Sequence, residues 1–97
     1  MISAVEIIEI LNKILVEKEP VRIKLIEDFQ NRIFNEENIS DEALCEIVAD
    51  LAYNLDFYEP NDEWRKQDSS FFDGERLEEI LKAEIIRIEN LTKSTTG

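Results

Sequence analysis

The stretch DGERLEEILKAEIIRIENL, residues 73–91, repeats apolar side chains at intervals of three and four. At about 100° per residue, this spacing places them on one side of an α-helix that begins at Asp73 or Gly74 and ends near Leu91. Glu84 falls inside the same arc, so we expect helix winding to rotate it outward; if buried, it needs a hydrogen-bond donor such as a tyrosine hydroxyl or Arg87. The side chains expected in the core are Leu77, Ile80, Leu81, Ile85, Ile88 and Leu91.

Three earlier segments show the same periodicity and carry helix-start signals. Ser3 with Glu6 forms a capping box before residues 4–18. Pro20 suits the first turn of a second helix that ends near Asn35, and Ser40 or Asp41 caps a third over residues 41–56. Their apolar faces comprise Ile7, Ile10, Leu11, Ile14 and Leu15, then Leu25, Ile26, Phe29 and Ile33, then Leu44, Ile47, Val48, Leu51 and Leu55.

These four segments predict an all-α fold, a small antiparallel four-helix bundle with a long ordered loop between helices three and four. The 97 residues suffice for one domain, which we place at residues 1–91, with a flexible tail over residues 92–97. Only two glycines and two prolines leave little material for the tight turns of a β-fold. The chain shows no apolar run of about 18 residues and no basic leader, so we expect it in the cytoplasm.

The net charge of −12 argues against nucleic acid or an anionic membrane as a direct ligand and favours a basic partner. The charge is uneven, because residues 33–64 hold ten acids and no base. On a helical wheel Glu42, Glu46, Asp50 and Tyr53 fall within about 80° of one another, opposite the apolar face. This pattern has two interpretations: a solvated face, or an interface whose carboxylates, one turn or about 5.4 Å apart, imitate nucleic-acid phosphates toward a positively charged protein.

The connection over residues 57–73 is long for a compact domain and contains five aromatic residues. We expect Phe57 and one of Phe71 or Phe72 to pin the connection to the bundle. For Tyr58 and Trp64 the sequence fits a position in the core and a position at an interface equally well. Acids in this region extend the charge of the third helix, so we expect one continuous acidic surface. The residues expected to contact a partner are Glu42, Glu46, Asp50, Tyr53, Asp56, Tyr58, Glu59, Asp62, Glu63 and Trp64.

The sequence Tyr58-Glu59-Pro60-Asn61-Asp62, followed by a charged loop with Arg65 and a last helix, resembles the colicin D immunity family, which includes immunity proteins of contact-dependent growth inhibition systems. The resemblance implies a small acidic four-helix protein that neutralises a basic tRNA-cleaving toxin domain by covering its active site. It also implies that Glu59 and Asp62 face the toxin. Asn61 departs from the acid often found there. The DNase-colicin immunity family is similar more faintly, over residues 54–60.

The sequence offers few of the residue combinations that catalysis requires. The chain has no histidine and only two glycines, which argues against Cys–His or Ser–His pairs and phosphate-binding loops, and we expect no enzyme, cofactor or metal. Cys45 cannot form an internal disulfide and is expected to be a small buried hydrophobe. The alternative function is an acidic helical adaptor or regulatory module unrelated to toxins. We expect the free chain to be a monomer, with a dimer left open.

Overall fold

The computed structural model describes residues 2–35, 39 and 41–94, and this part of the chain is helical throughout its regular structure. The long helices are α1 (Ala4–Val16), α2 (Val21–Asn35), α3 (Glu42–Asn54) and α5 (Gly74–Ser94). A 3-10 turn, η1 (Leu55–Phe57), continues α3, and a single helical turn, α4 (Asp62–Arg65), interrupts the connection to α5. The all-α class predicted from periodicity is therefore confirmed.

The predicted caps explain where the helices begin. The Ser3 hydroxyl accepts the Glu6 amide at 3.2 Å, and the Asp41 carboxylate accepts the Leu44 amide at 3.0 Å. Asp73 does the same for the Arg76 amide at 3.0 Å before α5. Ser40 lies outside the described residues.

The predicted ends are less accurate than the starts. The first helix stops at Val16, two residues early, and the third gives way to η1 after Asn54. The last helix continues to Ser94, so the predicted tail loses its first three residues to α5, and residues 95–97 lie outside the described part.

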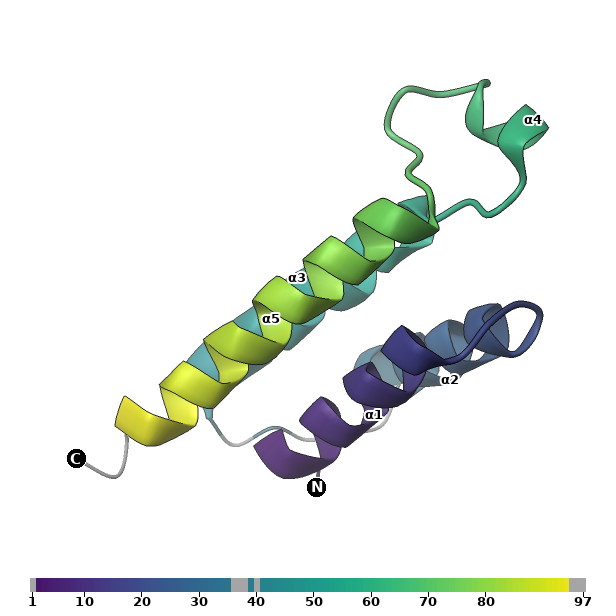
Figure 1. The fold of residues 1–97 in the computed structure, drawn as a ribbon. Helices are drawn as coiled ribbons and strands as arrows, with labels where there is room; N and C mark the ends of the chain where they lie inside the picture. Colours follow the sequence, from purple (N-terminus) through teal and green to yellow (C-terminus); the bar gives the residue numbers. More distant parts are fainter. Residues whose placement is uncertain (1, 36–38, 40, 95–97) are drawn as a thin grey trace.

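The four long helices share one core. In Figure 1 α1 and α2 lie as a pair beside α3 and α5, and contacts join α1 to α2 and α5, and α3 to the same two helices. Every apolar position predicted to face inward is buried in this core or packs against it. The side chains with no measurable exposure are Ile7, Leu11, Ile14, Val48, Ala52, Leu77, Leu81 and Ile88.

One charged side chain lies inside this apolar arrangement. Arg22, near the start of α2, is buried, and its Nε donates to the Ile14 carbonyl at 3.0 Å. Its Nη2 donates to the Leu15 carbonyl at 2.7 Å and lies 3.5 Å from the carboxylate of Glu78 on α5. The guanidinium therefore supplies donors to carbonyls near the end of α1, where the helix dipole also favours a cation.

We predict that Arg22→Met lowers the free energy of unfolding by about 2–3 kcal/mol, because it leaves buried carbonyls without donors. Urea denaturation at pH 7 measures the change. Lys24→Met on the same helix is the control. Lys24 is exposed and its ion pair with exposed Asp28 is long, at 3.8 Å, so the loss of this pair is expected to cost less than about 0.5 kcal/mol. Equal losses in the two variants would contradict this role for Arg22.

Candidate functional site

Three carboxylates on α3 form an exposed row, which we call the acidic stripe: Glu42, Glu46 and Asp50. The apolar residues of α3 turn the opposite side of the helix toward the core, so the stripe faces solvent. Within the part of the chain that the structure describes, none of the three takes part in an ion pair or a side-chain hydrogen bond. Like charges at successive i,i+4 positions destabilise a helix by about 0.2–0.5 kcal/mol per pair. The stripe is therefore uncompensated negative charge.

The stripe continues into an exposed aromatic side chain. Tyr53 is 62% exposed, and its ring meets that of Phe57 edge to face, with centroids 6.0 Å apart. Asp56 lies one turn further on and accepts the amide of Gln30 at 2.8 Å. The same amide nitrogen donates to the Ala52 carbonyl at 2.9 Å, so Gln30 of α2 holds the end of α3 in place. Tyr53 is accessible to a partner, whereas Asp56 also has a structural contact.

Tyr58, which the sequence leaves open between core and interface, lies in the core with 8% of its surface exposed. Its hydroxyl donates to the carboxylate of Glu19 in the α1–α2 connection, and its ring lies 6.1 Å from that of Phe72. An isolated parallel bridge joins Tyr58 and Phe72: the Phe72 amide donates to the Phe57 carbonyl at 2.9 Å, and the Glu59 amide to the Phe72 carbonyl at 3.0 Å. Tyr58 therefore closes the base of the connection, together with Phe72.

The segment around α4 does not extend the stripe as unpaired charge. Asp62 pairs with Arg65, and Glu63 lies 3.6 Å from Lys66. Half-buried Glu59 contributes its carbonyl to Arg65 at 3.0 Å, and its carboxylate accepts the Asn61 amide at 3.2 Å. The predicted surface is acidic along α3 but ion-paired around α4, because the two bases that follow the acidic run fold back onto it.

Asn61 and Trp64 define the shape of this segment. The Asn61 side chain accepts the amides of Glu63 at 2.9 Å and Trp64 at 3.2 Å, so the residue that departs from the colicin D immunity pattern is the cap of α4. Trp64 is 60% exposed. In Figure 1 α4, the turn that includes Trp64, stands beyond the ends of α3 and α5.

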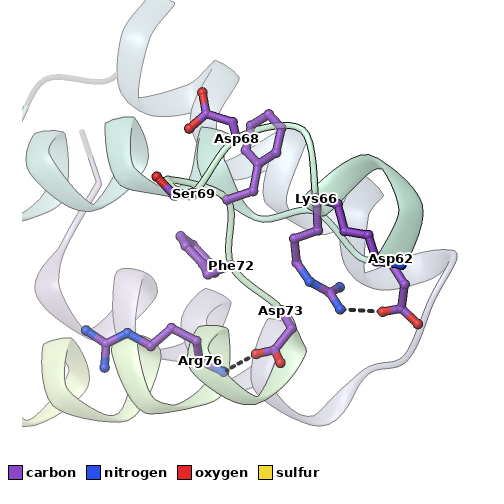
Figure 2. Close-up of a pocket in the computed structure, with 9 residues that line it drawn as sticks. Asp62, Lys66, Asp68, Ser69, Phe72, Asp73 and Arg76 are labelled. Atoms are coloured by element: carbon purple, nitrogen blue, oxygen red, sulfur yellow. Dashed lines mark hydrogen bonds and ion pairs between the residues drawn. The ribbon is translucent and has the colours of Figure 1, made fainter.

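An open cavity of about 700 Å³ lies between the α4 segment and the start of α5. Figure 2 shows Phe72 among the lining side chains, with Asp62 bound to Arg65 and the Asp73 carboxylate bound to the backbone amide of Arg76. Its ionisable groups are mixed: Asp62, Asp68 and Asp73 with Arg65, Lys66 and Arg76. Within the described residues, no three or more His, Cys, Asp or Glu side chains are grouped to hold a metal ion, and none of the helices has the length and apolar character needed to span a membrane.

Two expectations for single residues are settled by the structure. Cys45 is exposed, so its prediction as a buried residue is wrong. Glu84 is half-buried on α5 and has Arg87 as its donor, at 3.3 and 3.4 Å.

Three residues that the sequence did not predict for the site support its structure. Arg22, Glu19 and Gln30 hold the helix ends and Tyr58 in place. A helical wheel contains a signal for Arg22, because this residue falls at about 100° from Val21, amid the apolar arc formed by Leu25 and Ile33. A cation within an apolar arc requires partners, and this requirement identifies it as structural.

Comparison with protein-family models, curated proteins and solved structures finds no match to this chain. The resemblance to the colicin D immunity family therefore stays a prediction from the sequence around Tyr58, Glu59 and Pro60.

The environment of Tyr58 predicts a loss of stability in alkali. Burial, the hydrogen bond to Glu19 and the negative charge of Glu19 raise the pKa of Tyr58 to about 12, and Arg22 acts in the opposite direction. Below pH 10 the hydroxyl is protonated in both states. Between pH 10 and 12 the unfolded chain releases this proton while the folded chain keeps it, so the free energy of unfolding falls as pH rises, by about 2 kcal/mol at pH 12.

Denaturant unfolding from pH 8 to 12 measures this loss, and Tyr58→Phe is expected to remove it from the pH profile. Tyr53→Phe, which changes an exposed tyrosine, should leave the alkaline loss unchanged. A Tyr58→Phe profile parallel to that of the wild type over this range would contradict the assignment.

Proposed function

We propose that this protein is an immunity protein, which binds a basic nuclease toxin domain and neutralises it by covering the active site with a surface that imitates the nucleic-acid substrate. The toxin class that best fits the resemblance to the colicin D immunity family is a tRNA-cleaving domain. One observation carries the proposal: the acidic stripe presents three exposed carboxylates without ion pairs, next to exposed Tyr53.

The geometry of α3 supports mimicry of a phosphate backbone. Successive stripe residues lie four positions apart, which is about 6 Å along a helix axis. A groove built for phosphates presents lysine and arginine side chains, and a row of carboxylates satisfies these donors as phosphates do. In this proposal α1, α2, α3 and α5 form an antiparallel four-helix bundle, which keeps α3 straight and its acidic side free.

Binding has two physical components in this proposal. The overall charge of −12 steers the basic toxin toward the molecule and raises the association rate. Tyr53 and Trp64, which are largely exposed in the free chain, become desolvated in the complex and slow dissociation. Tyr58 has no part in this contact, because its ring and hydroxyl are used to close the connection between α3 and α5.

The decisive experiment is co-expression with a basic nuclease domain encoded next to this chain. We expect a stoichiometric complex that abolishes tRNA cleavage. If no complex forms at micromolar concentrations and cleavage continues, the proposal is wrong. A stable complex with a neighbouring protein that lacks nuclease activity would instead support the adaptor function.

We predict that Glu42→Gln, Glu46→Gln and Asp50→Asn together lower the association rate by about tenfold at low salt and flatten its salt dependence. Stopped-flow binding measures both effects. Because the triple variant removes like-charge repulsion, its melting temperature should equal or exceed that of the wild type.

The matched control is the triple variant Glu9→Gln, Glu27→Gln and Glu89→Gln, which removes the same charge from exposed positions on the other long helices. It should change the association rate less than about threefold, through net charge alone. Equal effects of the two triple variants would remove the stripe from the interface.

We predict that Trp64→Ala raises the dissociation rate by about tenfold with little change in association rate. Because Trp64 is exposed, the melting temperature of the variant should stay within about 2 °C of that of the wild type. Phe34→Ala, which removes an exposed aromatic side chain from α2, is the control and should leave dissociation unchanged. A lower melting temperature with unaltered binding would show that Trp64 is structural.

A further inference from the structure

A second pocket, of about 530 Å³, lies where the end of α3 meets α5. From α3 and η1 it is lined by Asn54 and Phe57, and from α5 by Ile80 and Glu84 among others. Phe57 also carries the edge contact to Tyr53, and Asn54 lies one turn after Asp50. The pocket therefore adjoins the acidic stripe and its exposed tyrosine.

Glu84 is the unusual member of this lining. Its position on α5 falls at about 340° from Leu77, inside the apolar arc, and only 19% of its side chain is exposed. A covered carboxylate costs free energy unless donors satisfy its oxygens. Glu84 has one such donor, because Arg87 reaches both oxygens through the same nitrogen, at 3.3 and 3.4 Å.

This ion pair is easily replaced. The Arg87 side chain is 61% exposed and pairs with Glu84 at i,i+3. Such surface pairs contribute little to stability. The other base in the lining, Arg76, is already 3.5 Å from Glu79, which lines the same pocket. Glu84 is thus a carboxylate at an aromatic and aliphatic pocket whose present donor is able to swing into solvent.

We propose that this pocket receives an arginine side chain of the basic protein partner. The planar guanidinium donates to both carboxylate oxygens of Glu84 and stacks on the ring of Phe57, while its methylene groups contact Ile80. An arginine fits better than a lysine because its fork of donors matches the two oxygens and its planar group stacks on an aromatic ring. The proposal rests on the immunity function in requiring a basic partner, and it adds the pocket, Glu84 and the arginine.

The test uses the intact protein and the capped peptide acetyl-Gly-Arg-Gly-amide, followed by NMR titration at pH 7. We expect saturable shifts centred on the pocket residues Asn54, Phe57, Ile80 and Ala83. Glu84→Gln should weaken binding by at least about fivefold, and the corresponding lysine peptide should bind at least about threefold more weakly to the wild type. Shifts that spread over all acidic faces without saturation would overturn the proposal.

The matched control is Glu89→Gln, which removes an exposed carboxylate at about 120° on the wheel, on the other flank of α5. It should leave peptide binding within about twofold, since only net charge changes. Glu84→Leu provides a second variant, which suits the apolar arc and should melt no lower than the wild type while losing peptide binding. Equal weakening by Glu84→Gln and Glu89→Gln, or full binding by Glu84→Leu, would overturn the assignment.

The two proposals fail separately. Peptide binding at Glu84 without inhibition of the nuclease domain would leave the pocket assigned and reject the immunity function. Nuclease binding that depends on the stripe but is unchanged in Glu84→Gln would retain the immunity function and reject the arginine pocket.

Discussion

The buried guanidinium of Arg22 constrains the rest of the fold. The Arg22 side chain extends from α2. Its guanidinium donates to the Ile14 and Leu15 carbonyls at 3.0 and 2.7 Å and lies 3.5 Å from the carboxylate of Glu78 on α5. Burying a cation is unfavourable unless its donors are satisfied. A shift of α1 or α5 away from α2 would leave the guanidinium without these acceptors and would destabilise the fold. Hydrophobic burial alone allows helices to slide, because it is non-directional. These directed contacts instead specify one arrangement at the end of the molecule where α1 turns into α2.

The same end of the molecule holds the connection that carries exposed Trp64. Tyr58 packs there with its hydroxyl on Glu19, and a Cβ added at Gly74 would lie 3.5 Å from a terminal nitrogen of Arg22. The start of α5 therefore lies close against the buried cation. Because the backbone bridge between Tyr58 and Phe72 closes the base of the connection, α4 extends from a fixed position. Trp64 is thereby held in water, as Tyr53 is on α3, and this exposure is unfavourable for large rings unless a partner covers them.

Local rules account for most of what the sequence predicts correctly. The four helices, their starts at Ser3, Asp41 and Asp73, and the exposure of the acidic stripe follow from periodicity and capping. The remainder depends on contacts between distant segments. Tyr58 is buried with its hydroxyl on Glu19, 39 residues away, and the exposure of Cys45 depends on how the neighbouring helices pack, which local periodicity does not encode. The turn of α4 spans only four residues, too few for a helical period, and depends on the Asn61 cap and on Arg65 reaching Glu59.

The distribution of ion pairs bears on function more directly than the net charge. Many of the bases pair within or between the other elements, as Arg32 does with Glu6 at 3.5 Å, Arg76 with Glu79 at 3.5 Å, and Lys66 with Glu63 at 3.6 Å. A protein kept soluble by charge alone has no reason to leave a single helix face without any base, because mixed signs also maintain solubility and stabilise helices. The described part of α3 has acids at three successive turns with no base within reach. Such segregation lowers helix stability slightly, and this cost is offset when a cationic partner supplies the missing charges.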